Sequence, residues 1–233
     1  MLSSPQTWKE FFQIYYQNEV NKLAGKVMNN SSDRSIYINF QDLMSFRGGV
    51  LAQELINNPE KVMDDAREGL ALTDNIYDIK LENCPVRFVN LPSHLKKNVD
   101  EIRCDTVGKF VAIEGIVRKT TEVKPRLSKA IFECSSCERT IEIDIEPSLA
   151  SDRLPKPHKC DCGSKSLKLS NKSIKIDSQR LRLQSFPEHG QPQSIDVFIE
   201  GDIAGKLAPG NRVIINGIVK DEFKNKFYAE TVY

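Results

Sequence analysis

The sequence has no long apolar run and no export signal. Its 233 residues are 39% hydrophobic, enough for one large or two modest cores, yet each apolar run is far shorter than the roughly 20 residues that span a bilayer. The N-terminus also lacks a basic region followed by an apolar stretch. We therefore expect an intracellular protein in a reducing compartment, without a membrane partner.

Two catalytic motifs are missing as well. There is no Gly-x-x-x-x-Gly-Lys-Ser/Thr phosphate loop, because the stretch from Gly201 to Leu207 is one spacer short and lacks the hydroxyl that would bind Mg²⁺. There is no His-Glu-x-x-His or His-x-Glu arrangement to activate a metal-bound water. These residues are therefore not expected to hydrolyse ATP as a P-loop enzyme or to hold a catalytic zinc.

Four of the six cysteines form two close pairs. Cys134 and Cys137 are separated by two serines, and after a gap of 22 residues Cys160 and Cys162 are separated by one aspartate. Two tight turns of this kind bring four thiolates around one tetrahedral Zn²⁺ with no open coordination position. The second pair is one residue shorter than usual, so His158 stays an alternative fourth ligand to Cys162.

We expect the zinc to be structural, because four thiolates close the site. A disulfide needs an oxidising compartment. An enzyme that used these thiols in redox or metal chemistry would need a general base or an electropositive pocket, and the sequence near the pairs indicates neither. The remaining cysteines, Cys84 and Cys104, are expected to be small buried residues.

The net charge of +1 is unevenly distributed. Residues 1–84 carry 8 Lys+Arg against 12 Asp+Glu, and residues 85–233 carry 25 against 20. Two stretches beside the cysteine pairs are more basic still: 117–129 has five basic residues and one acidic, and 165–182 has six and one. These stretches predict contact with a polyanion, although any single lysine there fits a solvated loop equally well.

Helical patterns occupy the first part of the chain. Ser4 and Pro5 are a typical helix start, and Trp8, Phe11, Phe12 and Tyr15 follow on one predicted face, which we interpret as core. The alternation of Ile36, Ile38 and Phe40 predicts a short strand, with helices expected near Asp42, Gly49 and Pro59.

From Pro85 the period changes to alternation. Residues 108–119 and 210–221 agree at six of 12 positions, each with an interior glycine, Gly115 or Gly217. A duplication is one interpretation. We favour two strands of one barrel that share the need for a glycine bend. Further strands are expected at 173–184, 194–200 and 223–232, with an exposed connection at 188–192.

These patterns predict a multi-part α+β fold: a helical bundle lobe plus an OB-fold β-barrel with an inserted zinc-binding β-lobe. The expected division is a helical lobe at 1–84, the first part of the OB-fold at 85–130, the zinc lobe at 131–168, and the second part of the OB-fold at 169–233.

Several stretches together resemble the N-terminal region of the minichromosome maintenance proteins, the ring helicases of archaeal and eukaryotic replication. They are the run Ile102–Arg126, Val86–Pro92, the paired cysteines, Asp177–Gln184 followed by Phe186-Pro187-Glu188, Pro209–Val213, and in the helical part Asp42-Leu43 and Asn58–Glu60.

The resemblance implies a hexameric ring, or two rings stacked through their zinc lobes, that binds single- and double-stranded DNA in its channel. ATP and Mg²⁺ would belong to a motor domain outside these residues, and the chain would be the N-terminal part of a longer helicase acting in replication initiation and unwinding. Such a protein is nucleoid-associated in the cytoplasm, or nuclear in a eukaryote. The stretch 188–193 resembles the family's loop between this region and the motor.

Basic residues of the OB-fold bind DNA in this family. The matching positions are Arg118, Lys119, Lys124, Arg126, Arg180 and Arg182. The family's basic hairpin falls within 220–228, where this sequence leaves only a short turn with Lys224 and Lys226. The shortened Cys160–Cys162 pair is a second departure from the family.

A different hypothesis is a stand-alone zinc-containing OB-fold protein that binds single-stranded DNA as a monomer. Such a protein needs aromatic stacking platforms on the barrel surface. The candidates are Phe110, Phe132, Phe223 and Phe227, although each fits a core position equally well.

Overall fold

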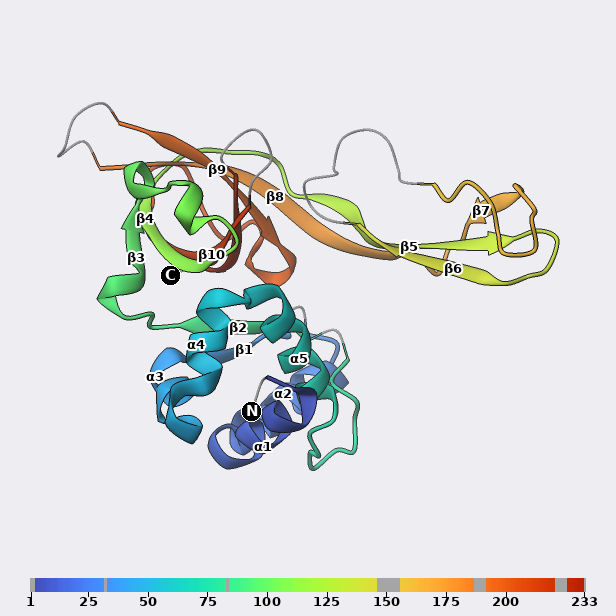
Figure 1. Ribbon diagram of the computed structural model, residues 1–233, viewed down its shortest axis with the longest axis horizontal. Helices are drawn as coiled ribbons and strands as arrows, with labels where there is room; N and C mark the ends of the chain where they lie inside the picture. The colour runs from blue at the N-terminus through green and yellow to red at the C-terminus, as the bar shows by residue number, and fades with distance from the viewer. Residues whose placement is uncertain are drawn as a thin grey trace.

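The computed structural model describes residues 3–31, 33–82, 84–145, 156–186, 192–220 and 226–232, with only the backbone at 226–230 and 232. A helical lobe lies beneath a β-barrel, and a narrow lobe projects sideways from the barrel on two long strands (Figure 1). The fold is mixed α+β, as the sequence predicts. No helix in the described ranges is long and apolar enough to cross a membrane.

Five α-helices build the helical lobe within the described residues. They are α1 (Pro5–Tyr15), α2 (Gln17–Met28), α3 (Phe40–Ser45), α4 (Val50–Asn57) and α5 (Pro59–Ala71). The predicted helix start is confirmed: the Ser4 hydroxyl accepts a hydrogen bond from the Thr7 amide, and Pro5 occupies the first turn. Trp8, Phe11 and Phe12 are fully buried and form the centre of this core.

A two-stranded parallel sheet joins the helical lobe to the rest of the chain. Strand β1 (Ile36–Asn39) pairs with β2 (Val86–Val89), which places Ile38 opposite Phe88. The Phe88 ring packs against Trp8 on one side and against Phe110 of the barrel on the other. Strand β2 therefore follows the predicted boundary at residue 84 in sequence but packs in the core of the helical lobe.

The β-barrel is closed by five strands. They are β4 (Phe110–Thr120), β10 (Arg212–Lys220), β11 (Lys226–Val232), β9 (Ser194–Glu200) and β8 (Ile174–Gln184), in spatial order. A further pairing of β4 with β8 closes the ring, and β3 (Lys96–Asn98) adds to the free side of β4. Closure removes the exposed edges of an open sheet and is the OB-type arrangement predicted from the sequence.

The two similar stretches are antiparallel neighbours in this barrel. Strands β4 and β10 pair with Ile113 opposite Ile215. A Cβ atom on Gly115 would lie 2.6 Å from the Gln184 backbone oxygen, and a register shift occurs beside Gly217. Both glycines thus lie where β-strands approach closely or change register. This agrees with the interpretation that two strands of one barrel each need a glycine at such a position.

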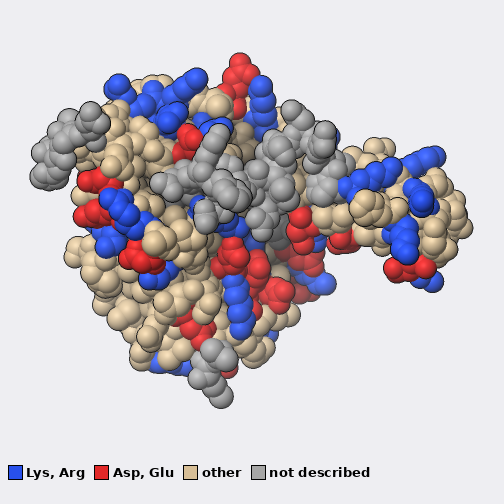
Figure 2. Space-filling model, turned by 45° about the horizontal axis from the view of Figure 1, so that its top comes forward, with Lys and Arg blue, Asp and Glu red and all other residues tan. Residues whose placement is uncertain are grey.

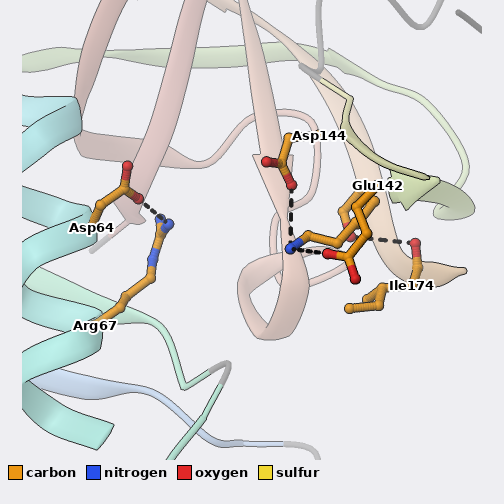
Figure 3. Close-up of polar contacts among 7 residues, drawn as sticks. Asp64, Arg67, Glu142, Asp144 and Ile174 are labelled. Carbon is orange, nitrogen blue, oxygen red and sulfur yellow. Dashed lines mark hydrogen bonds and ion pairs between the residues drawn. The ribbon is translucent and has the colours of Figure 1, made fainter. Parts of the chain in front are cut away.

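The projecting lobe is carried by β8 and by β5 (Lys124–Cys134), two strands of 11 residues that extend out of the barrel (Figure 1). Strands β6 (Thr140–Asp144) and β7 (Leu167–Leu169) pair with the outer half of β5. We term β5 together with β6 the stem of the lobe. In the middle of β5, the Lys129 ammonium lies 3.3 Å from Glu142 and 3.7 Å from Asp144 of β6, a cross-strand cluster separate from the Asp64–Arg67 pair on α5 (Figure 3).

Three local predictions are wrong. Tyr15 is 40% exposed, and the buried ring beside Phe11 is instead that of Tyr16. Phe40 is buried as expected but begins α3, because the Asn39 side chain caps a helix there. Cys104 is exposed, because it lies on a short 3-10 helix, Cys104–Thr106, at the surface.

Candidate metal centre and nucleic-acid interface

The four paired cysteines meet at the end of the projecting lobe. Their sulfur atoms all lie within 4.8 Å of one another, with 3.7 Å between Cys134 and Cys162 and 3.6 Å between Cys137 and Cys160. Four sulfurs bound tetrahedrally to Zn²⁺ at about 2.3 Å lie about 3.8 Å apart. The cluster therefore has the dimensions and the donor atoms of a structural zinc site.

Each cysteine pair sits on a tight turn that ends in a left-handed residue. After Cys134 and Cys137, the Glu138 amide donates to the Cys134 carbonyl at 2.9 Å, and Glu138 has a φ of 58°. In the second turn the Gly163 amide donates to the Cys160 carbonyl at 2.8 Å, with a φ of 84°. Two similar turns thus face each other, although one pair is a residue shorter than the other.

Backbone amides favour the thiolate form of Cys134, whereas desolvation and the neighbouring thiols raise the pKa of Cys137. Hydrogen bonds from the amides of Ser136 and Cys137 lower the pKa of the Cys134 thiol to about 6. A thiolate is the form that binds a metal cation. His158 is exposed and is not part of the sulfur cluster, so the geometry favours Cys162 over His158 as the fourth ligand.

A small apolar core supports the cluster. Among the described residues, Phe132, Leu167 and Ile145 are buried together with Cys134 and Cys160, and Leu127, Ile141 and Ile143 pack against them from partly buried positions. Phe132 is one of the predicted stacking platforms, but it is 2% exposed; Phe110 is fully buried in the core shared by the helical lobe and the barrel. Both are core residues and neither presents a face to a base.

A group of the predicted DNA-binding residues lies on one outer face of the barrel. In the register, Lys119 of β4 is opposite Arg182 of β8, and Lys124 of β5 is opposite Ser178, two residues from Arg180. Directly opposite residues, and residues two apart on one strand, point to the same side of a sheet. The exposed side chains of this group define what we term the basic strip: Lys119, Lys124, Arg180 and Arg182.

Arg118 joins the basic strip because of a β-bulge. The register between β4 and β8 advances by two residues on β4, from Val117 to Lys119, but by one residue on β8. Arg118 is the extra residue, and both Arg118 and Lys119 are exposed while Val117 is buried. Strict alternation would have turned one of the two basic residues inward.

Arg126 differs from the other predicted residues. Its side chain is 14% exposed and forms an ion pair with Glu200. The same guanidinium donates to the carbonyls of Leu127 and Ile145 at 2.8 and 2.9 Å. Arg126 therefore makes contacts within the chain where the sequence predicted a contact with DNA.

Two acidic residues reduce the charge of the strip. Arg180 pairs with Asp196 of β9, and Lys124 lies 3.7 Å from Glu122. Both basic side chains stay accessible, with exposed fractions of 49% and 75%. Figure 2 shows Lys and Arg side chains gathered at the upper edge of the barrel and around the end of the projecting lobe.

The remaining predicted residues lie outside the residues or side chains that the structure describes. Lys224 and Phe223 belong to 221–225, and the side chains of Lys226 and Phe227 are not described. Most of the predicted connection at 188–192 also falls outside the described ranges.

Sequence reasoning missed two arginine–aromatic pairs beside the strip. The Arg180 guanidinium lies 5.6 Å from the centre of the Phe198 ring, and that of Arg212 lies 5.2 Å from the centre of the Phe186 ring. Phe198 is opposite Arg180 in the register of β9 and β8. The alternating sequence of each strand shows which side chains share a face, but the contact between Arg180 and Phe198 can be predicted only when the pairing of β8 with β9 is known.

The comparisons with known proteins agree with this architecture. A model of the MCM OB domain family matches residues 98–222. The chain is 32% identical over 201 residues to a minichromosome maintenance protein MCM of Saccharolobus solfataricus, covering 80% of this chain and 28% of that protein. It is 28% identical over 164 residues to the DNA replication licensing factor mcm6 of Schizosaccharomyces pombe, covering 66% of this chain and 18% of that protein.

A solved structure is similar over almost the whole chain. The crystal structure of the N-terminal domain of an archaeal MCM superimposes with a TM-score of 0.78 at 30% identity, covering 98% of this chain and 97% of that one. The chain thus spans less than a third of the length of the two relatives above, and nearly all of this separate N-terminal domain.

Proposed function

The chain belongs to the minichromosome maintenance family, and on that premise we propose that it is the N-terminal DNA-binding and ring-assembly region of a replicative, ATP-dependent DNA helicase. The motor that would hydrolyse ATP with Mg²⁺ belongs to a part of the protein outside these residues. Within them, the proposed division is the helical lobe, the zinc lobe and the two parts of the OB-fold that flank the zinc lobe.

The observation that carries the DNA-binding proposal is the basic strip. Its side chains come from three neighbouring strands and are all exposed on one face. Lysine and arginine in such an array neutralise phosphates and release bound counterions, which produces affinity with little sequence preference. Arg180 also lies over an aromatic ring, so a base stacked nearby would meet a planar cation.

The cysteine cluster supports a structural zinc site made by Cys134, Cys137, Cys160 and Cys162. The metal would supply a tetrahedral cross-link and no reaction chemistry, because four thiolates leave no position for water. The chain's own contribution is the pair of turns that points the sulfurs inward. A lobe whose core is so small depends on such a cross-link for its fold.

Ring assembly would strengthen DNA binding by proximity. One chain offers only a few phosphate contacts, since the basic strip contains five basic side chains with Arg118 included and two of them have acidic neighbours. Several chains around one strand add their contacts through a high effective concentration. We expect homo-oligomers, a hexamer or a double hexamer, to bind DNA much more tightly than the monomer does.

A salt titration of DNA binding tests this function. The probe is a fluorescently labelled oligo-dT strand, and the readout is anisotropy across a range of salt concentrations. The double variant Lys119→Gln/Arg182→Gln should bind more weakly, and its slope of log K against log salt should fall by about 0.7 per lost contact on a single strand.

The matched control is Lys22→Gln, which removes an exposed lysine from α2 on the helical lobe. Its affinity and salt slope should equal those of the unchanged chain. If the double variant and the control behave alike, the basic strip is not the DNA-binding surface.

A further inference from the structure

Glu200 contacts two arginines that belong to different parts of the molecule. It is the last residue of β9 in the barrel. Its carboxylate pairs with Arg126 of β5, and its backbone carbonyl accepts a hydrogen bond of 3.3 Å from Arg87 of β2. One residue of the barrel thus contacts both the stem of the zinc lobe and the strand that packs in the helical lobe.

The contact with the stem involves both β5 and the end of β6. Arg126 lies on β5, and its guanidinium also donates to the carbonyl of Ile145, the residue that follows β6. The ion pair is largely covered, with exposed fractions of 14% for Arg126 and 26% for Glu200. Any tilt of the stem away from the barrel must therefore break this shielded ion pair, whereas the hydrogen bond to Ile145 holds the Arg126 side chain within the stem.

The contact with the helical lobe is deeper. Arg87 is 3% exposed, and its guanidinium pairs with Asp202, which is 6% exposed, and donates to the Ser35 hydroxyl at 2.9 Å. Asp202 lies on the short 3-10 helix Gly201–Ile203 that directly follows Glu200. A buried guanidinium that loses its partner is costly, so this contact fixes where the end of β9 lies.

A nearby ion pair on the same strand differs from those at the end of β9. Arg180 and Asp196 also pair on the outer face of the barrel. Their strands, β8 and β9, are neighbours in the barrel, so that pair joins two elements already held by a ladder. The Arg87–Asp202 pair instead joins β2 of the helical lobe to the barrel, and the Arg126–Glu200 pair joins β5 to β9 across β8, the strand with which both of them pair.

We propose that Arg87, Arg126, Glu200 and Asp202, which we term the arginine junction, couple the packing of the helical lobe to the orientation of the zinc-lobe stem. When Arg126 leaves Glu200, the end of β9 keeps its pairing with Ser178 of β8 but loses its side-chain contact with the stem. The Glu200 carbonyl and the Asp202 carboxylate then shift relative to Arg87, and the contact with the helical lobe weakens. Displacement of one lobe is thereby transmitted to the other through Glu200 and Asp202 of the barrel.

Amide hydrogen exchange on the full 233-residue chain tests the coupling. Glu200→Gln removes the charge that pairs with Arg126 but keeps the carbonyl that Arg87 contacts. We expect amide exchange to become about tenfold faster in the stem, at 126–134 and 140–145, and also in β1 and β2. A tenfold change in the opening equilibrium lies within the range of interaction free energies found for residues in contact.

Asp196→Asn is the matched control, because it removes a carboxylate from the same strand and face. It should leave exchange in β1 and β2 unchanged. The proposal is overturned if Glu200→Gln accelerates exchange only in the stem, or no more than the control does in β1 and β2. Neither result depends on DNA binding or ring assembly, so the proposed function is tested separately.

A double-variant cycle provides the second measurement. Arg126→Gln and Asp202→Asn perturb opposite sides of the junction, and the combined variant should accelerate exchange in β1 and β2 less than the product of the single effects. If Asp202→Asn does not fold, Ser35→Ala takes its place, because it removes only a neutral partner of Arg87. Independent, multiplicative effects would contradict the coupling.

Discussion

At the scale of single residues, the surroundings decide what the same residue type does. Gly25 and Gly69 both lie inside helices, where alanine is intrinsically better than glycine by about 1 kcal/mol. A Cβ on Gly25 would contact the Tyr77 ring at 3.5 Å, an ordinary distance. A Cβ on Gly69 would lie 2.4 Å from the Trp8 Cβ and 2.7 Å from the Pro5 carbonyl, so α1 and α5 pack closely there only because the side chain is missing.

We therefore expect opposite effects from one kind of substitution. Gly69→Ala should lower the free energy of unfolding by about 1–3 kcal/mol, because backbone and a buried tryptophan must move apart. Gly25→Ala should raise it by about 0.5–1 kcal/mol. Urea denaturation followed by circular dichroism measures both, and a stabilised Gly69→Ala variant would contradict the close packing of α1 and α5.

The two unpaired cysteines differ in the same way. Burial raises the pKa of the Cys84 thiol to about 11, whereas Cys104 is exposed. The thiolate is the reactive form, so at pH 8 iodoacetamide should modify Cys104 quickly and Cys84 only after unfolding. Mass spectrometry of the labelled peptides measures the two rates.

The raised pKa also sets the sign of a pH effect on stability. The folded chain keeps the Cys84 proton to higher pH than the unfolded chain does. The stabilisation that this provides is complete below the unfolded pKa of about 8.5 and is lost as the pH rises toward 11. Cys84→Ala should remove this part of the alkaline loss of stability, and an unchanged pH profile would contradict the burial of the thiol.

At the scale of elements, β5 and β8 belong to two structures at once. The inner half of β8 pairs with β4 and β9 of the barrel, and its outer half pairs with the inner half of β5. The outer half of β5 pairs with β6 and β7 of the projecting lobe. The barrel has its own core, built around residues such as Ile113, Val197 and Ile215, and among the described residues this core shares none with the core of the lobe. The lobe should therefore be able to unfold while the barrel stays folded.

Removal of one thiolate tests this independence. Cys134→Ser should abolish stoichiometric zinc binding and unfold the lobe, because the remaining core is too small to stay folded. Hydrogen exchange should become fast at 130–145 and 160–169 and stay slow in β4, β9 and β10. Chelator treatment of the unchanged chain should have the same effect.

Cys104→Ser is the control, since it replaces an exposed cysteine outside the cluster. It should keep both the zinc and the slow exchange of the lobe. Global melting of Cys134→Ser, or no change at all, would contradict a structural metal site in a separable lobe.

At the scale of the whole molecule, side-chain contacts hold the helical lobe against the barrel in addition to the polypeptide that connects them. Phe88 packs against Phe110, the Asn216 side chain donates to the Phe88 carbonyl at 2.9 Å, and Lys220 lies 2.7 Å from Glu60 of α5. Together with the arginine junction, these contacts make one extended particle from parts that have different folds.

We expect the chain to assemble into a ring in solution. Sedimentation at micromolar concentration should detect a particle of six chains of 26.4 kDa each, or a double ring of twelve. Zinc removal should dissociate a double ring before it affects a single one, because the metal supports only the projecting lobe. A strictly monomeric chain that still binds single-stranded DNA would favour the stand-alone alternative.

Much of the local structure was predictable from sequence because it depends on neighbours in the chain. Ser4 and Pro5 begin a helix by their own chemistry, alternation located β8 and β9, and cysteine spacing identified the cluster. In each case the physical cause acts over a few residues.

Tertiary structure alone decided the properties that depend on residues far apart in the chain. The basic composition of 117–129 and 165–182 indicated a polyanion, but strand pairing and the bulge at Arg118 determined which side chains share a face. Arg126 fitted the same pattern and yet turned to Glu200, 74 positions away. A single sequence records a charge but not the partner that folding places beside it, so the basic strip and the arginine junction became visible only in three dimensions.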